Sequence, residues 1–87
     1  MGYMEYYIYW IIDFTQNKTY IGFTNNLTRR ISEHKNKKVR STKNFKEYKI
    51  FVLEKTNTIF IARKREKYWK SCSGRKKLKI LFSKIIT

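Results

Sequence analysis

The stretch EYYIYWIIDFTQNKTYIGF, residues 5–23, decides the fold, because two strand-forming runs flank a short polar segment. Residues 5–13 are so dense in Tyr, Ile and Trp that we expect a strand buried on both faces. Residues 14–18 are typical of a turn, and residues 19–23 predict a second short strand. A connection of five residues favours an antiparallel hairpin.

Beyond the hairpin, the sequence predicts three helices and one more strand. Thr24, Asn25 and Asn26 are candidate caps for a helix over about residues 26–35. The basic, aperiodic residues 35–46 indicate an exposed loop. The remaining predicted elements are a strand over 48–54, a helix over about 58–71 capped by Thr58, and a helix over about 74–85, with Gly74 ending or separating the two helices. We expect one domain over residues 1–87, an α/β (α+β) fold with helices flanking a small three-stranded antiparallel or mixed sheet.

The charge of the chain predicts a polyanionic partner. The 87 residues include 21 Lys and Arg against six Asp and Glu, which gives a net charge of +15 at pH 7. Such a surface attracts nucleic acid and releases counterions when it binds. Ribosome binding, anionic-lipid binding and a merely solvated basic surface are the alternatives at this point.

Cysteine content and hydropathy predict a cytoplasmic protein. Cys72 is the only cysteine, so neither an internal disulfide nor a zinc cluster of Cys and His can form within the chain. The N-terminal residues lack the pattern of a signal peptide. No apolar run approaches the ~18 residues that would span a bilayer, so we expect no membrane partner.

Glu66 is a candidate metal ligand. Ile59, Ala62, Glu66 and Trp69 are spaced to share one helix face, and the rest of that face is apolar. A carboxylate in such a position either pairs with a basic neighbour such as Lys70 or holds a cation. A Mg²⁺ ion bound by one protein carboxylate and several waters is physically ordinary.

Two further groups of residues are candidates for phosphate chemistry. Arg30 and His34 lie four apart on the first predicted helix and project in the same direction. An Arg can donate two N–H groups to one phosphate. Tyr9 and Tyr20 belong to the two strands of the hairpin, where facing residues bring their hydroxyls together. For each of these residues, ordinary packing is the alternative.

In combination, these residues resemble the GIY-YIG endonuclease family. Tyr7-Ile8-Tyr9 resembles the first motif, with Tyr7 at the position of the family's Gly, and Tyr20-Ile21-Gly22 matches the second. Residues 26–34 resemble the Arg-bearing helix of the family, and residues 62–71 resemble its Glu-bearing helix. The resemblance covers nearly the whole chain and extends to short stand-alone bacterial domains similar to the N-terminal nuclease domain of the excinuclease subunit UvrC. Many family nucleases carry an Asn late in the domain, whereas here no Asn follows Asn57.

The resemblance implies a divalent-metal-dependent endonuclease that hydrolyses phosphodiester bonds in DNA, including structured or branched DNA met in repair or recombination. Glu66 would hold a single Mg²⁺ or Mn²⁺ ion, and Arg30 would stabilise the charge of the transition state. Tyr9 would position or deprotonate the attacking water, which requires its pKa to fall from about 10. Tyr20 and His34 would orient or assist.

Basic residues outside this set are expected to contact DNA phosphates and so to position the substrate without reading its sequence. They form two groups, one beside the first helix and one near the C-terminal helix: Lys35, Lys37, Lys38, Arg40 and Lys43, then Lys70, Arg75, Lys76, Lys77 and Lys79. We expect a monomer. Two other functions stay open: a binding module that keeps the fold without the chemistry, and a basic accessory protein of RNA or the ribosome.

Overall fold

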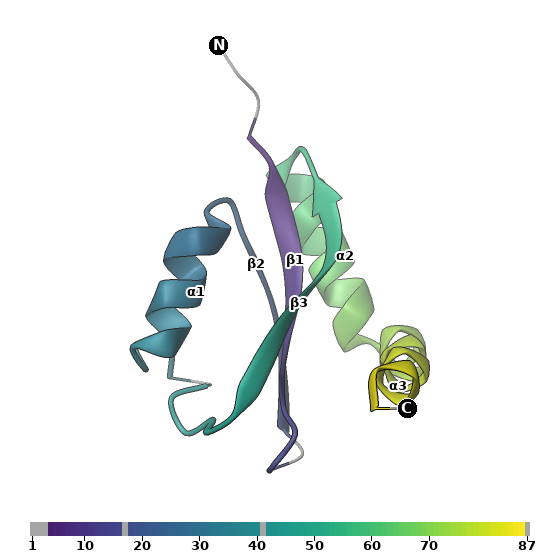
Figure 1. Cartoon of the computed structure of the whole chain (residues 1–87). Coiled ribbons are helices and arrows are strands. Elements are labelled where there is room, and N and C mark those ends of the chain that lie inside the picture. The colour runs from purple at the N-terminus through teal and green to yellow at the C-terminus, as the bar shows by residue number, and fades with distance from the viewer. Residues whose placement is uncertain (1–3, 17, 41, 87) are drawn as a thin grey trace.

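The structure, a computed structural model, describes residues 4–16, 18–40 and 42–86. The elements are β1 (Tyr6–Asp13), β2 (Lys18–Thr24), α1 (Leu27–Lys35), β3 (Tyr48–Thr56), α2 (Ile59–Lys70) and α3 (Cys72–Ile86). One sheet in the order β2-β1-β3 lies between α1 on one side and α2 and α3 on the other (Figure 1). The predicted α+β fold is therefore confirmed, and both strand pairs are antiparallel.

The central strand β1 divides the core into two halves. Ile8, Trp10 and Ile12 pack toward α2 and α3, with Ala62, Trp69 and Leu78. Tyr9 and Ile11, which alternate with them, pack toward α1. Side chains alternate between the faces of a strand, so a strand that is apolar at every position is covered on both sides. The prediction from residues 5–13 is confirmed.

Asp13 fixes the turn of the hairpin and the approach to β3. Its buried carboxylate accepts hydrogen bonds from the backbone N–H groups of Thr15 at 2.9 Å and of Lys46 at 2.9 Å. The Thr15 hydroxyl donates to the same carboxylate and contributes most to lowering its pKa to about 2. One ionised side chain thus joins two segments that lie far apart in the sequence.

The boundary between the last two helices differs from the prediction. The break lies at Ser71, whose backbone is extended, and Gly74 lies inside α3. A Cβ atom at Gly74 would lie 2.5 Å from the Cα atom of Trp69. Gly74 is therefore needed where α3 passes close to the end of α2, and it does not separate the helices.

Residues 35–46 are only partly the exposed loop that their composition predicts. Most of the lysines are exposed, but Thr42 and Phe45 are buried. Phe45 belongs to the half of the core under α1. Sequence periodicity could not reveal these two inward side chains, because the described residues between α1 and β3 form turns and irregular segments without a repeating pattern. Across the described residues, none of the helices combines the length and the hydropathy that a membrane span needs.

Candidate active site

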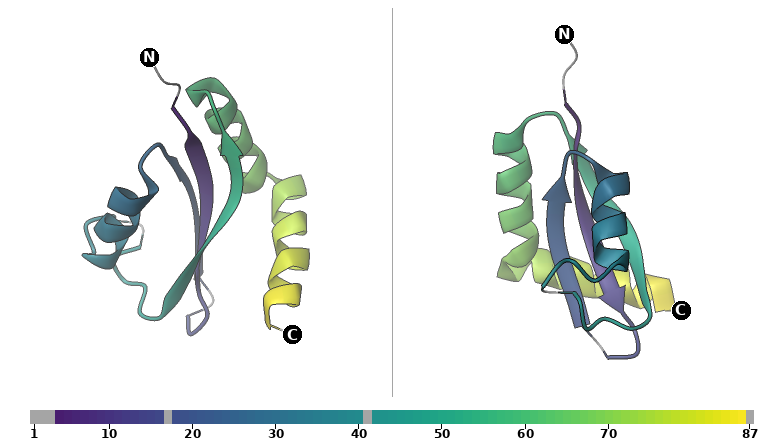
Figure 2. Two further views of the ribbon diagram at one scale, coloured as in Figure 1. Left: turned by 45° about the horizontal axis from the view of Figure 1, so that its top comes forward. Right: turned by 90° about the vertical axis from the view of Figure 1, so that its left-hand side faces the viewer.

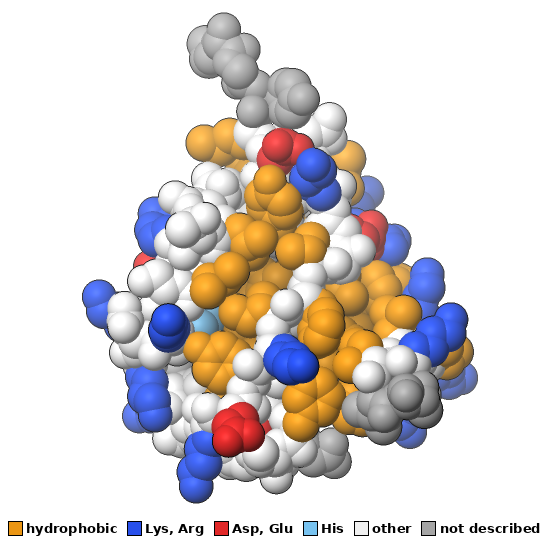
Figure 3. Space-filling model, in the orientation of Figure 1, with side chains coloured by type: hydrophobic (Ala, Val, Ile, Leu, Met, Phe, Trp, Pro, Cys, Tyr) orange, Lys and Arg blue, Asp and Glu red, His pale blue; other side chains and the backbone are white. Residues whose placement is uncertain are grey.

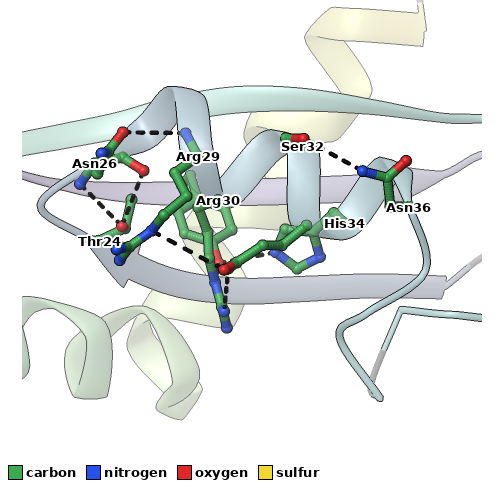
Figure 4. Close-up of polar contacts among 9 residues, drawn as sticks. Thr24, Asn26, Arg29, Arg30, Ser32, His34 and Asn36 are labelled. Carbon is green, nitrogen blue, oxygen red and sulfur yellow. Dashed lines mark hydrogen bonds and ion pairs between the residues drawn. The ribbon is translucent and has the colours of Figure 1, made fainter.

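The hydroxyl of Tyr9 is the centre of the candidate site. Its oxygen lies 3.1 Å from Nε of Arg30 and 3.0 Å from Nε2 of His34. Arg30 and His34 are one turn apart on α1, and both side chains point from that helix toward the sheet (Figure 4). The first helix thus brings the predicted Arg and His to the predicted Tyr.

We assign the tautomer of His34 from its two hydrogen bonds. The Nε–H of Arg30 can only donate, so the Tyr9 oxygen accepts that bond, and we assign the Tyr9 proton to the contact with Nε2 of His34. The proton on the His34 ring then lies on Nδ1, which is 2.6 Å from the hydroxyl oxygen of buried Thr42. Burial, and secondarily the charge of Arg30, lower the pKa of His34, which favours this neutral form.

Tyr9 does not have the lowered pKa that a resting phenolate requires. Burial raises the pKa of its hydroxyl to about 12, although the hydrogen bond from Arg30 acts in the opposite direction. Arg30 does act to lower this pKa, but burial outweighs it, so the fall in pKa that the proposed role of Tyr9 requires is not present in the protein alone. Tyr9 is a neutral phenol at pH 7, already hydrogen-bonded to a neutral imidazole that can accept its proton.

Two residues of β2, Tyr20 and Gly22, lie beside Tyr9. Gly22 pairs with Tyr9 in the ladder, and Tyr20 pairs with Ile11 two residues along. The Tyr20 ring centroid lies 6.0 Å from that of Tyr9 and 5.3 Å from that of His34. A Cβ atom at Gly22 would lie 2.7 Å from the Tyr9 hydroxyl oxygen, so a glycine is required for the ring of Tyr9 to cross β2 here.

The start of α1 and a carboxylate on its surface fix the position of Arg30. The side chain of Asn26 caps the helix by accepting from the N–H of Arg29 at 3.0 Å, as predicted (Figure 4). Nη1 of Arg30 lies 3.0 Å from Oε1 of Glu33. The bond to Tyr9 contributes most to raising the pKa of Arg30, and the bond from Arg30 lowers that of Glu33.

Two surface hollows meet this cluster from opposite ends of α1. One, of about 290 Å³, is lined by Arg30 together with Tyr6, Phe23, Thr24, Asn25, Arg29 and Ile59. The other, of about 450 Å³, is lined by His34 together with Lys35, Lys37, Phe45, Lys46, Glu47 and Tyr48. The hydrogen-bonded set of Arg30, Tyr9 and His34 therefore lies between two concave surfaces.

Glu66 does not belong to this hydrogen-bonded set. It lies on α2, which packs against the other face of the sheet, and its Oε2 atom is 3.6 Å from Nζ of Lys70. The Glu66 side chain is half-buried, with 25% exposure. No hydrogen bond or ion pair between described residues connects it to Tyr9 or Arg30. The sequence predicted that Tyr9, Arg30 and Glu66 meet. The structure shows Tyr9 and Arg30 in direct contact. The approach of Glu66 to them stays a prediction.

The predicted phosphate-binding residues lie on two separate sides of the molecule. Lys35, Lys37, Lys38, Arg40 and Lys43 are exposed beside α1, whereas Lys70, Arg75, Lys76, Lys77 and Lys79 are exposed at the junction of α2 with α3 and along α3. Figure 3 shows basic side chains on both flanks of an apolar central strip. Lys35 and Lys37, from the group beside α1, line the same hollow as His34.

Sequence reasoning assigned no role to Thr42, Glu33 or Gly22. Thr42 lies in a segment without a period, so nothing marked it as a partner of His34. Glu33 could have been recognised, because it follows Arg30 by three residues on a helix. Among the described residues, no group of three or more His, Cys, Asp and Glu side chains gathers in the way a metal cage made of protein ligands requires.

Comparison with known proteins gives one match. The model of the family described as the GIY-YIG catalytic domain matches residues 5–79, a span that includes every residue of the cluster and Glu66. The searches of curated proteins and of solved structures give no match.

Proposed function

This chain belongs to the GIY-YIG catalytic domain family, and from that premise we propose that it is a divalent-metal-dependent endonuclease that hydrolyses phosphodiester bonds in DNA. Membership of the family indicates nuclease-type activity and a nucleic acid substrate in general. It therefore favours an enzyme over a basic accessory protein of RNA or the ribosome.

The observation that carries the proposal is the double hydrogen bonding of the Tyr9 hydroxyl. Arg30 donates to it from one side, and Nε2 of His34, which we assign as the acceptor, lies 3.0 Å away on the other. A buried tyrosine needs only one partner to satisfy its hydroxyl. A guanidinium and an imidazole on the same phenol supply a phosphate-binding cation and a proton acceptor within one turn of helix.

The position of Glu66 on α2 supports a role beside this cluster. On one side of α2, Nε of Arg65 lies 2.6 Å from Oε2 of Glu54, so that side faces β3. Ile59 lies on the other side, where it lines the same hollow as Arg30. Residues seven apart share a helix side, so Glu66 faces the same edge of the sheet as Ile59.

The position of Glu66 along the length of α2 also supports a role beside the cluster. Seven residues of helix cover roughly 10 Å. α2 runs alongside β2 in the opposite direction (Figure 2), starting from the hollow that Ile59 shares with Phe23. About three residues of β2 cover the same length. Three residues before Phe23 on β2 is Tyr20. We infer that Glu66 and Tyr20 lie at the same level of β2, on its two faces.

The residues present fit a single divalent ion held mainly by water and substrate. Glu66 is a partly exposed carboxylate whose ion pair with Lys70 is loose. Mg²⁺ commonly binds to one or two carboxylates together with waters and substrate phosphates. Glu66 would hold the ion, and the bound ion would neutralise charge on the scissile phosphate and its leaving oxygen.

The remaining residues would move the proton and stabilise charge. Water attacks phosphorus and passes a proton to the Tyr9 oxygen, while the Tyr9 proton passes to Nε2 of His34. The new O–P bond forms as the P–O bond to the departing strand breaks. Arg30 has N–H groups beyond those bonded to Tyr9 and Glu33, and these would stabilise the added negative charge on the phosphate. His34 becomes a cation that Thr42 holds in place.

Cleavage of supercoiled plasmid tests this function. The wild type is compared with Glu66→Gln and Arg30→Ala in Mg²⁺, in Mn²⁺ and in EDTA, and Glu5→Gln, which removes a partly exposed carboxylate paired with Lys55, serves as the matched control. We expect cleavage by the wild type and the control with a divalent metal only, and losses of at least 100-fold in the other two variants. Equal rates for Glu66→Gln and the wild type would remove Glu66 from the mechanism.

A DNA-binding module without activity is the second candidate function. The absence of any Asn after Asn57 favours it, because many nucleases of the family carry an Asn late in the domain. A wild type that binds DNA but leaves it intact in every divalent metal would establish this alternative.

The biological role is a finer proposal. Resemblance to the nuclease domain of UvrC favours repair or recombination, in which structured DNA is cut. We further propose that the chain acts as a monomer in the cytoplasm. Sedimentation of the wild type with and without a branched DNA tests the stoichiometry, and a dimer at working concentrations would contradict it.

A further inference from the structure

We propose that the hollow at the C-terminal end of α1 binds an unpaired nucleotide of the substrate strand next to the scissile phosphate. This inference deepens the proposed function and rests on it. The consequence is that the protein selects DNA with a single-stranded branch over an uninterrupted duplex.

The composition of the hollow fits a nucleotide. Its volume of about 450 Å³ is within the range of small-ligand sites. Three lysines line it against one carboxylate, with the aromatic side chains of Phe45, Tyr48 and His34 between them. Proteins bind single-stranded nucleic acid with this combination, in which cations hold the backbone and aromatic rings stack on the bases.

The position of the hollow links it to the reaction. His34 lines the hollow and is also hydrogen-bonded to Tyr9. Arg30 lines the second hollow at the other end of the cluster. A strand that follows α1 from one hollow to the other therefore contacts Arg30 at one end and His34 at the other, the two residues that are bonded to Tyr9.

The backbone at Lys37 supplies an independent observation. The N–H of Lys38 donates to the carbonyl of Glu33 and the N–H of Lys37 to that of His34, which is the bonding of a Schellman motif. Lys37 occupies the position that usually holds Gly, and its φ of 61° lies in the left-handed region. A lysine in that conformation destabilises the fold relative to Gly. The Lys37 side chain lines the nucleotide-sized hollow, and a role in binding there would explain why a lysine and not a glycine occupies this left-handed position.

Lys37→Gly separates binding from folding. Glycine adopts the left-handed conformation of residue 37 without the steric cost that a lysine has, so the unfolding temperature should rise by several degrees. Loss of the lysine side chain should weaken binding of the unpaired nucleotide. A variant that merely fails to fold would show the opposite thermal shift. Lys38→Ala is the matched control, because it removes the same charge one residue away and outside the lining of the hollow.

The test is the affinity for two fluorescent DNAs in EDTA, so that no cleavage occurs: a splayed fork and the fully paired duplex of the same length. We expect the wild type to prefer the fork by about tenfold or more, the scale of stacking one base on an aromatic ring. Lys37→Gly and Tyr48→Leu should bring this ratio close to one. Lys38→Ala should weaken both complexes alike and keep the ratio.

Equal affinity of the wild type for fork and duplex would overturn the proposal, as would equal effects of Lys37→Gly and Lys38→Ala on the ratio. Either result leaves the nuclease function standing, because cleavage is measured separately with metal. Conversely, a fork preference that depends on Lys37 in a protein that cuts no DNA supports this site and contradicts the proposed hydrolysis.

Discussion

Gly22 lies directly opposite Tyr9 in the β1–β2 ladder, and a Cβ atom at Gly22 would come within 2.7 Å of the Tyr9 hydroxyl oxygen. The space that Gly22 leaves empty is therefore filled by the phenol that Arg30 and His34 both contact. The Tyr9 hydroxyl on β1 can therefore occupy its position only because residue 22 on β2 is a glycine.

Gly22→Ala should therefore impair cleavage more than folding. The added methyl group must push the Tyr9 ring away from Arg30 and His34, and a displacement of about 1 Å can cost on the order of 100-fold in rate. We expect overpacking to destabilise the fold by about 1–3 kcal/mol. Plasmid cleavage and thermal unfolding measure the two effects. Thr19→Ala on the same strand is the control, and full activity in Gly22→Ala would contradict the steric argument.

Tyr9→Phe should abolish cleavage while DNA binding persists. The substitution keeps the ring in the core but removes the oxygen through which the proton would pass from water to His34. We expect a rate loss of at least about 100-fold, in the range for removal of a general acid–base group. Single-turnover cleavage and affinity for duplex DNA are the measurements. A variant that cuts at the wild-type rate would exclude the hydroxyl from the reaction.

The pH dependence of cleavage should have its acid limb below pH 6.5. His34 must be neutral to accept the Tyr9 proton, and burial and Arg30 lower its pKa from the ordinary 6.5. The midpoint of the acid limb should therefore lie below pH 6.5, and His34→Gln should lose that limb. The measurement is kcat/KM from pH 5 to 9, and a limb centred above 6.5 would contradict it.

The same shift has a consequence for stability. Because the folded state holds the lower pKa, the unfolded chain takes up the proton first, near pH 6.5. The contribution of neutral His34 to the free energy of unfolding is therefore present above pH 6.5 and is lost as the pH falls toward the folded-state pKa. Denaturant unfolding of the wild type and His34→Gln at pH 7.5 and 5.5 measures it. The wild type should lose more stability than the variant between the two values.

Glu54→Ala should weaken the attachment of α2 to the sheet. Oε2 of Glu54 lies 2.6 Å from both Nε of Arg65 and Nε1 of Trp69, and Trp69 is buried. Loss of the carboxylate leaves the indole N–H without a partner, which costs about 1–3 kcal/mol. Calorimetric unfolding, with exposed Glu47→Ala as the control, measures this cost. An unchanged unfolding temperature would show that the two hydrogen bonds to Glu54 contribute little to the free energy of unfolding.

The sequence by itself determined the fold class and the elements. Continuous apolar character in residues 8–12 requires cover on both faces of β1, and this local pattern needs no knowledge of long-range contacts. The spacing of Arg30 and His34 likewise follows from the helix alone. The motifs identified the family, because their order along the chain is a property of the sequence.

Only the tertiary structure decided which partners these residues meet. Thr42 reaches His34 through turns that have no period, and Gly74 is required by a helix crossing and not by a helix end. The pKa of Tyr9 is raised because burial outweighs the hydrogen bond from Arg30, a balance that depends on the complete packing of the core. A sequence records which groups a chain carries, but burial and distance between remote segments set their charge states and their partners.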